Sequence, residues 1–507
     1  MDTSLNVERR GIELAALADG RVVDVLVVGG GVTGAGIALD AASRGLSVAL
    51  IEAKDLAFGT SRWSSKLVHG GLRYLAKGDV RLAHESAVER GILMTRTAPH
   101  LSHPLPQLIP LHRGISGGSA ALVMAGLRAG DTLRRVARTP TALLPRPRRV
   151  STQESLALVP GLWQAGLRGG LLSFDGQLTD DARLVVALAR TAAGLGATIL
   201  TKTTVTAVTG DGAEVRDELT GRVFEVRARS VINAAGVWAG TLVDSVRLRP
   251  SLGSHLVVSG RGLGLGRTAL TVPVPGERSR FVLLLPQRDG LVYIGLTDEP
   301  YPDEIPDEPL APQSDVDFLL DVASSVLQRK LTQADVLGSY AGLRPLLEAT
   351  GRSADLSRKH AVLTAPNGVI TVVGGKLTTY RRMAQDAVDR AVAAAGLTAG
   401  KVRTANLPLV GADTRPLLST VDAPTRLVER YGTEAPEVAK LGSTPVATGL
   451  DVTDAEVIWA VRHEGALDAD DVLHRRTRIG LVPANLELAR QRVTDLVTSE
   501  LRSPTPS

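Results

Sequence analysis

The clearest hydrophobic pattern in the sequence lies near its start. An aliphatic, β-branched run at 22–28 predicts a buried parallel strand. A cluster of glycines follows it, and then an alanine-rich stretch at 35–44 predicts a helix that ends at Gly45. A second apolar run at 47–51 predicts a second strand. Together these residues predict a strand–helix–strand unit with a glycine-rich first turn.

Later apolar runs predict the rest of the architecture. We expect strands at 230–235, 256–258, 281–285, 291–294 and 369–373, and helices at 314–330 and 378–395. Beyond about residue 400 the pattern becomes helical and amphipathic. We therefore predict a region at 1–398, with insertions mainly at about 100–165 and 250–345, and a separate helical segment at 399–507.

Composition excludes several kinds of chemistry. The 507 residues include no cysteine, which excludes disulfides, thiolate nucleophiles and cysteine-ligated metals. The nine histidines show no metal-ligand spacing, so we expect no metal. The net charge of +5 is mild for this length and does not favour nucleic acid as a partner. The first 21 residues carry charges throughout and no apolar run reaches about 18 residues, so we expect neither an export signal nor a membrane-spanning helix.

The glycine cluster has the spacing of a dinucleotide-binding turn. Gly29, Gly31 and Gly34 form a G-x-G-x-x-G pattern with Thr33 inside it, and Glu52 follows the second strand. Glycines at these places allow the backbone to approach a pyrophosphate at the start of a helix, and the acid binds a ribose hydroxyl. An acid there disfavours NADP. The fingerprint alone leaves FAD and NAD open.

Two later features favour FAD. The strand near 231 ends in a turn of small residues that contains Ala235 and Gly236, as in flavoproteins whose chain returns past the ADP half of the cofactor. A late strand then runs into a Gly-Gly-Lys turn at 374–376 and a helix. The start of that helix can face the flavin locus where negative charge gathers on reduction.

Nine short stretches resemble one flavoenzyme family. They lie in the same order as in that family and span about residues 22 to 490: TSRWSSKLVHGGLRYL at 60–75, DDARL at 180–184, GSH at 253–255, IGLTD at 294–298, GLRPL at 342–346, SR at 357–358, GGKLTTYR at 374–381, VRHE at 461–464 and RRT at 475–477. The family is that of the FAD-dependent (aerobic, respiratory) glycerol-3-phosphate dehydrogenases.

The resemblance implies a fold and an activity. The fold is an α/β, Rossmann-like FAD-binding domain with an inserted β-rich (α+β) substrate domain and a C-terminal helical domain. The implied reaction is hydride transfer from C2 of sn-glycerol 3-phosphate to flavin N5, giving dihydroxyacetone phosphate, with the electrons passing to a respiratory quinone. The implied location is the cytoplasmic face of the cytoplasmic membrane, as a peripheral protein, or the cytoplasm, and the chain could form a homo-oligomer.

The resemblance also implies site residues, whose chemistry suits the reaction. A phosphate dianion needs cations, and an alcohol needs a base for its proton. The implied catalytic residues are His255, Arg344 and Lys376, and the substrate ligands are Arg73, Tyr74, Arg344 and Arg358. The implied FAD contacts are Gly29, Gly31, Thr33, Gly34, Glu52, Thr60, Ser61, Ser65, Lys66, His69, Gly70, Gly71, Ala235, Gly236, Gly375, Lys376, Leu377 and Thr378. The family commonly has Lys or Arg where this chain has Leu252, which implies one cation fewer at the rim of the site.

Residues 113–150 hold eight arginines and one acid, with apolar residues between them. One interpretation is a solvated surface. The other is a basic, partly apolar patch that docks on anionic lipid and brings the flavin near a quinone.

Three alternative functions remain open from the sequence. The first is a glycerol-3-phosphate oxidase that reduces O₂ to peroxide. The second is an amino-acid oxidase of the same flavoprotein superfamily, and the third is a non-catalytic FAD-bound scaffold.

Overall fold

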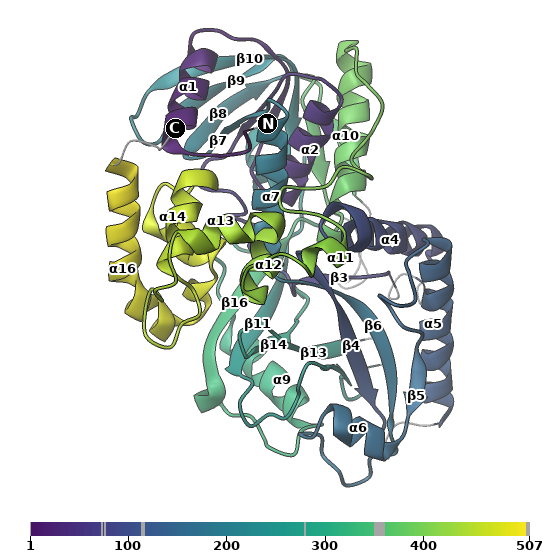
Figure 1. The fold of residues 1–507 in the computed structure, drawn as a ribbon. Coiled ribbons are helices and arrows are strands. Elements are labelled where there is room, and N and C mark those ends of the chain that lie inside the picture. Colours follow the sequence, from purple (N-terminus) through teal and green to yellow (C-terminus); the bar gives the residue numbers. More distant parts are fainter. Residues whose placement is uncertain are drawn as a thin grey trace.

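Two β-sheets lie one above the other, and a group of helices formed by the C-terminal part of the chain packs beside them (Figure 1). The computed structural model describes residues 2–71, 75, 78–112, 117–277, 280–348 and 360–502. The predicted Arg73, Tyr74 and Arg358 lie outside the described residues.

The upper sheet has the strand order β17-β18-β10-β1-β2-β7. Its central strands β18, β10, β1, β2 and β7 pair in parallel, and a β8–β9 hairpin extends from β10. The strands are β1 (Val23–Val28), β2 (Val48–Ile51), β7 (Thr198–Leu200), β8 (Thr203–Thr209), β9 (Gly212–Asp217), β10 (Val223–Asn233), β17 (Ala361–Thr364) and β18 (Ile370–Val373). The predicted strand–helix–strand unit at 22–51 is confirmed.

Helices cover this sheet because its strands are apolar on both faces. The helices are α1 (Val7–Ala18), α2 (Val32–Ser43), α7 (Asp181–Gly194) and α10 (Tyr380–Ala395). Helix α2 packs between α7 and α10. A Cβ on Gly36 would lie 2.9 Å from the Tyr380 ring, so glycine at this position allows α2 and α10 to approach closely.

The lower sheet has the order β15-β11-β14-β13-β12-β4-β6-β3, with β16 beside β11 and β5 beside β6. Its strands are β3 (Leu67–Val68), β4 (Ser102–Pro110), β5 (Arg148–Val150), β6 (Gly170–Leu178), β11 (Ser251–Ser259), β12 (Ala269–Pro273), β13 (Phe281–Pro286), β14 (Leu291–Gly295), β15 (Glu299–Pro300) and β16 (Val336–Arg344). Its helices are α4 (Val80–Ile92), α5 (Gly117–Val136), α6 (Thr152–Leu158) and α9 (Gln313–Ser324), and the short α8 (Ala239–Leu242) follows β10.

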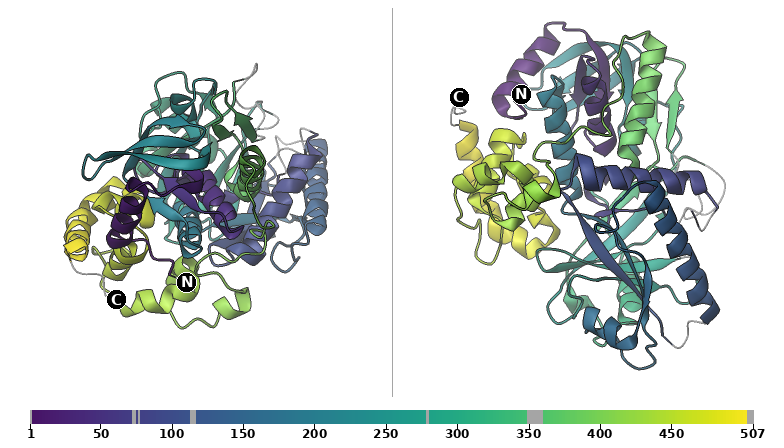
Figure 2. Two further views of the ribbon diagram at one scale, coloured as in Figure 1. Left: turned by 90° about the horizontal axis from the view of Figure 1, so that it is seen from above. Right: turned by 45° about the vertical axis from the view of Figure 1, so that its right-hand side comes forward.

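Helix α9 is shorter than the sequence predicts. It ends at Ser324 rather than near residue 330. The chain leaves the helix because Leu327 forms a β-bridge with Leu162, and the Ser324 hydroxyl accepts a hydrogen bond from the Leu331 N–H at 2.9 Å. Helix α5 lies along the outer edge of the molecule (Figure 2).

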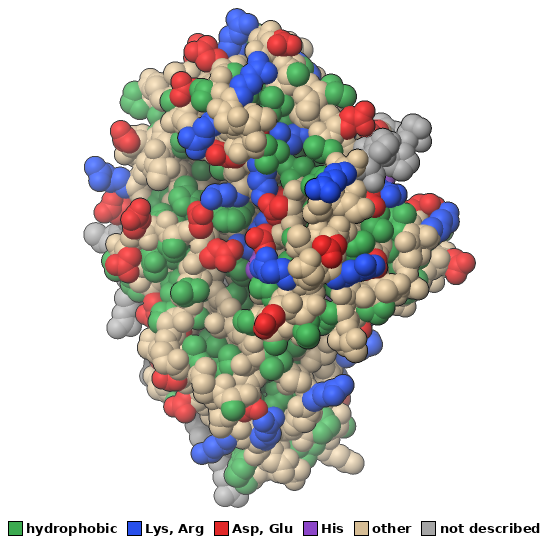
Figure 3. Space-filling model, turned by 90° about the vertical axis from the view of Figure 1, so that its left-hand side faces the viewer, with side chains coloured by type: hydrophobic (Ala, Val, Ile, Leu, Met, Phe, Trp, Pro, Cys, Tyr) green, Lys and Arg blue, Asp and Glu red, His purple; other side chains and the backbone are tan. Residues whose placement is uncertain are grey.

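The C-terminal helices are joined to the rest of the chain by buried and half-buried ion pairs. They are α11 (Arg415–Leu418), α12 (Thr425–Tyr431), α13 (Ala435–Lys440), α14 (Asp454–His463), α15 (Ala469–Asp471) and α16 (Pro483–Arg502). Glu464 pairs with Arg183 of α7 at 2.6 Å, and Glu434 pairs with Arg190 of α7 at 2.7 Å. The outer face of these helices carries interspersed acidic and basic side chains (Figure 3).

The segment Thr60–Lys66 connects the two sheets. The Lys66 ammonium is fully buried and lies 2.9 Å from Asp181 Oδ1, and Asp181 also accepts hydrogen bonds from the Ser64 hydroxyl and N–H. Lys66 has a φ of +58°, a left-handed conformation that a non-glycine residue adopts only when its surroundings require it. The ion pair therefore fixes both the path and the conformation of this segment.

We predict that Asp181→Asn lowers the free energy of unfolding by about 3 kcal/mol, because it leaves a buried ammonium without its counter-charge. Urea unfolding followed by tryptophan fluorescence measures this loss. The control is Glu437→Gln, which breaks the exposed Lys440–Glu437 pair and should cost less than about 1 kcal/mol. Equal stabilities for the Asp181 variant and the wild type would contradict this account of the segment.

Candidate functional site

The glycine turn between β1 and α2 has the shape of a pyrophosphate cradle. Gly29 has a φ of +109°, and a Cβ on Gly34 would lie 1.9 Å from the Gly29 carbonyl oxygen, so neither position accepts a side chain. Helix α2 begins at this turn, and Gly31 is its N-cap. The turn and Thr33 therefore lie at the positive end of the helix dipole. The Ser61 hydroxyl accepts a hydrogen bond from the Val32 N–H at 2.9 Å. The residues present fit a dinucleotide.

Glu52 directly follows β2 and closes this end of the cradle. Its carboxylate accepts hydrogen bonds from the N–H of Gly30 at 2.5 Å and from the N–H of Lys54 at 2.8 Å. Burial raises the pKa of Glu52 above its ordinary value. The turn after β10 borders the same cradle, since a Cβ on Gly29 would meet the Ala234 carbonyl at 2.7 Å and Ala235 and Gly236 come next.

His255 lies on β11 in a fully buried aromatic stack. Its ring is parallel to the Tyr340 ring at 4.6 Å, and its Nε2 is 2.8 Å from the Ser65 hydroxyl. Gly295 on the neighbouring strand leaves room for the ring, because a Cβ there would lie 2.2 Å from His255 Cδ2. Burial, together with the positive charges of Lys66 and Arg344, holds the pKa of His255 well below its usual range. The imidazole is therefore neutral, and its Nδ1 has no hydrogen-bond partner among the described residues.

Arg344 ends β16 opposite the start of β11. Its guanidinium lies 3.1 Å from the Asp298 carboxylate and donates to the carbonyls of Leu252 and Thr297. A Cβ on Gly253 would lie 2.1 Å from the guanidinium, so glycine there makes space for it. The Leu252 side chain is buried among Val237, Ala341 and Leu343.

The loop at 69–71 meets the turn at 375–378. The His69 N–H donates to the Thr378 hydroxyl at 3.2 Å, which joins the 69–71 loop to the turn that contains Gly375, Lys376 and Leu377. Gly375 has a φ of +76°, and the Lys376 ammonium donates to the Ser86 hydroxyl at 2.7 Å.

His69 is oriented by a buried carboxylate. Its Nδ1 lies 3.3 Å from Asp175, which also pairs with Arg90 at 2.6 Å and accepts from the Gly70 N–H. Burial alone would raise the pKa of Asp175, but Arg90 and His69 bring it down to about 2. A Cβ on Gly71 would meet the Ala83 backbone at 2.8 Å, so α4 closes over this loop.

The Thr60–Lys66 segment connects these groups into one site. The Thr60 hydroxyl donates to the Leu343 carbonyl at 2.6 Å, one residue before Arg344. Ser61 contacts the start of α2 and Ser65 contacts His255, as described above. The Lys66 ammonium pairs with Asp181, and this ion pair orients the segment.

Several supporting residues were not among the candidates from the sequence. They are Asp298, which holds Arg344; Tyr340, which stacks on His255; Asp175, which orients His69; and Ser86, which accepts from Lys376. Asp298 lies inside the IGLTD motif, which was a usable signal. The other three depend on contacts between distant elements that local spacing does not reveal.

In the described parts of the chain, no three His, Asp or Glu side chains come together as a metal ion requires. None of the described helices is long and apolar enough to cross a membrane.

Comparisons with known proteins identify the family. The family of FAD dependent oxidoreductases matches residues 24–417, and the C-terminal domain of alpha-glycerophosphate oxidase matches residues 402–504. "Glycerol-3-phosphate dehydrogenase 1" of Mycobacterium tuberculosis is 55% identical over 96% of each chain. The crystal structure of the glycerol-3-phosphate dehydrogenase from Bacillus halodurans, complexed with FAD, superposes with a TM-score of 0.74 at 26% identity and 98% coverage of both chains.

A second solved structure shares the fold. L-alpha-glycerophosphate oxidase from Mycoplasma pneumoniae, with FAD bound, has a TM-score of 0.58 at 20% identity and covers 77% of this chain and 99% of its own. With the cradle described above and the matches over almost its full length, the chain belongs to the family of FAD-dependent oxidoreductases and, within it, to the glycerol-3-phosphate dehydrogenases.

Proposed function

We propose that this protein oxidises sn-glycerol 3-phosphate to dihydroxyacetone phosphate with a bound FAD. The observation that carries the proposal is that one strand pair, β11 and β16, holds both Arg344 and His255. Arg344 is held by Asp298 and lies opposite Ser251, and the neutral, buried imidazole of His255 lies four residues further along β11, opposite Tyr340. The 55% identity to a relative named glycerol-3-phosphate dehydrogenase 1 supports the same substrate.

When bound, FAD supplies the acceptor for the hydride that leaves C2 of the alcohol. We assign the remaining tasks to side chains of this chain. Arg344 binds the phosphate, together with Arg73, Tyr74 and Arg358 from the sequence motifs, because arginine forks match phosphate oxygens. Lys376 lies at the start of the turn before α10 and stabilises negative charge on the flavin side.

His255 receives the hydroxyl proton. If Nε2–H donates to Ser65, Nδ1 keeps its lone pair and faces no other partner among the described residues. Because its pKa is lowered, this imidazole is neutral at neutral pH and is in the protonation state that a base requires.

We further propose a quinone as the electron acceptor and an anionic membrane surface as the docking partner. Helix α5 exposes Leu122, which is 75% exposed, together with the exposed Arg128 and Arg135. The same helix packs through Leu127 on the lower sheet. A helix that is fixed to the molecule and exposes apolar and basic side chains to solvent fits a lipid surface.

The oxidase is the second candidate, because one of the family matches is the C-terminal domain of alpha-glycerophosphate oxidase. It shares the first half-reaction and differs only in the acceptor.

We predict that Arg344→Ala raises the KM for sn-glycerol 3-phosphate about 100-fold, since it removes a charge-assisted phosphate contact and leaves Asp298 facing the phosphate. Steady-state kinetics with an artificial dye acceptor measure the KM, and the flavin spectrum reports bound FAD, which should be unchanged. The matched control is Arg462→Ala, which also removes an arginine paired with a carboxylate, Glu500, but this pair lies in the C-terminal helices α14 and α16. An unchanged KM in the Arg344 variant would refute its role.

We predict that the rate constant of flavin reduction at saturating substrate stays constant from about pH 7.5 to about pH 5.5, because the pKa of His255 lies well below 6.5. Stopped-flow absorbance under nitrogen measures it, and saturation removes the effect of substrate phosphate ionisation. A base with an ordinary histidine pKa would instead lose about tenfold in rate per pH unit below 6.5. Such a decline would contradict the assignment.

We predict that turnover with a water-insoluble quinone is faster in vesicles that contain phosphatidylglycerol than in pure phosphatidylcholine, and that added salt removes the difference. Leu122→Glu combined with Arg128→Glu should abolish the difference while dye-linked activity stays intact. Stoichiometric peroxide in air, with no acceleration by quinone, would favour the oxidase instead.

A further inference from the structure

The turn at 52–58 contacts the glycine turn at the adenosine end of the FAD site through two hydrogen bonds. It begins with Glu52, whose carboxylate accepts the Gly30 N–H. Further along, the Ala57 N–H donates to the Gly30 carbonyl at 3.0 Å. The position of this turn therefore determines both the ribose-binding acid and the backbone of the glycine turn.

Asp55 lies in the middle of this turn and is completely buried. Its carboxylate accepts two hydrogen bonds from Arg476, at 2.8 and 2.9 Å, and one from Arg475 at 2.6 Å. Both arginines lie on a π-helical turn, Val472–Arg476, of the C-terminal helical part. Burial would raise the pKa of Asp55, but the two guanidinium groups bring it down to about 2, so it is a carboxylate at neutral pH.

The two arginines are themselves held in place. Arg475 also donates to Asp471 at 2.6 Å, and Arg476 donates to the Glu464 carbonyl. Asp471 in turn pairs with Lys202, whose N–H donates to the Lys54 carbonyl at 2.8 Å. The C-terminal part thus contacts the turn at Asp55 and, through Lys202, at Lys54.

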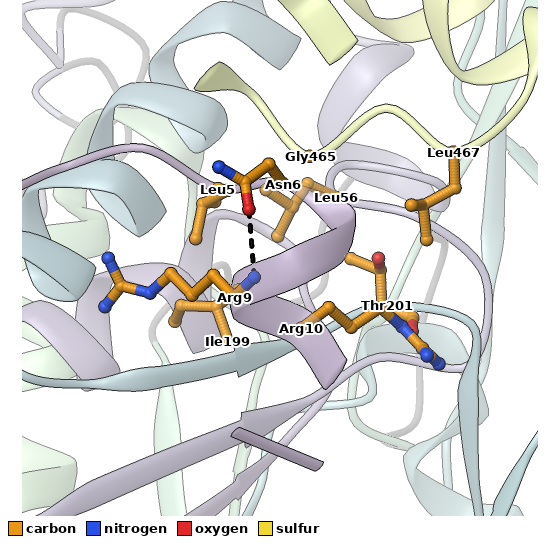
Figure 4. A pocket seen from close by; sticks show the side chains of 9 residues that line it. All are labelled: Leu5, Asn6, Arg9, Arg10, Leu56, Ile199, Thr201, Gly465 and Leu467. Carbon is orange, nitrogen blue, oxygen red and sulfur yellow. Dashed lines mark hydrogen bonds between the residues drawn. The ribbon is translucent and has the colours of Figure 1, made fainter. Parts of the chain in front are cut away.

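Apolar packing behind the turn is incomplete. A cavity of about 20 Å³, room for about one water molecule, lies between Leu56, helix α1, and Gly465 and Leu467 of the C-terminal part (Figure 4). Leu56 borders this cavity, although Leu56 and Ala57 are themselves buried in the core, so the ion pairs at Asp55 act together with apolar packing to hold the turn.

We propose that the C-terminal helical part completes the FAD site indirectly: Arg475 and Arg476 hold Asp55, and Asp55 positions the Glu52 turn for the adenosine ribose. Asp55, Arg475 and Arg476 are positioning residues and do not contact the cofactor. The affinity for FAD then depends on docking of the C-terminal helices. This inference rests on FAD binding and not on the identity of the substrate.

The test titrates FAD, and separately ADP, into the apoprotein of the full-length chain. Flavin fluorescence quenching gives the Kd for FAD, and calorimetry gives the Kd for ADP. Arg475→Gln removes one of the three hydrogen bonds to Asp55 and leaves the bidentate Arg476 contact, which favours retention of the fold; Asp55→Asn removes the charge itself. We expect the Kd of both ligands to rise by the same factor, about tenfold or more, in either variant.

The matched control is Glu434→Gln, which breaks the bidentate Arg190–Glu434 contact between the C-terminal helices and α7. It should lower the thermal midpoint of the apoprotein yet leave both Kd values within about twofold. An unchanged Kd in Arg475→Gln overturns the proposal. An equal rise of both Kd values in Glu434→Gln also overturns it, because it would indicate a general loosening of the fold. Weaker FAD binding with unchanged ADP binding overturns it as well, because it would place the effect at the flavin.

Discussion

A buried ion pair, Lys66–Asp181, holds the segment on which the site depends. The pair has almost no exposure to solvent, and burial lowers the pKa of Lys66 while the Asp181 charge opposes that shift. Such a pair contributes little net stability compared with apolar packing, but the loss of one partner is costly. The pair matters for the geometry of the site, because it holds Lys66 in its left-handed conformation at the end of a segment that contacts α2, β11 and β16.

That fixed segment explains how residues almost 300 positions apart form one site. Ser61 contacts the first turn of α2, Ser65 contacts His255, and Thr60 contacts the residue before Arg344. The cofactor cradle belongs to the upper sheet, and the histidine and arginine belong to the lower sheet. Their relative position therefore follows from hydrogen bonds along seven consecutive residues rather than from either sheet alone.

Much of the dinucleotide unit could be predicted from the sequence, because its signals are local. Strand, glycine turn, helix and acid follow one another within 31 residues, and steric limits on Gly29 and Gly34 leave few alternatives. His255 and Arg344 came from motif resemblance. The role of Tyr340 and the Asp55–Arg476 contact could not be predicted, because each joins elements that are far apart in the chain and carries no periodic pattern.

Helix lengths were less predictable for the same reason. The apolar pattern of α9 continues past Ser324, but the Leu327–Leu162 bridge ends the helix.

In the arginine-rich 113–150 stretch, Arg134 is buried against Asp131 while Arg135 is half exposed. Charge alone did not distinguish an anchoring arginine from a surface arginine.

The most direct measurement is the absorbance spectrum of the purified holoprotein under nitrogen, before and after sn-glycerol 3-phosphate is added. We expect an oxidised flavin spectrum that bleaches with this substrate, while glycine and D-alanine leave it unchanged. A flavin spectrum that stays oxidised with sn-glycerol 3-phosphate would contradict the proposed function, although the FAD fold would stand.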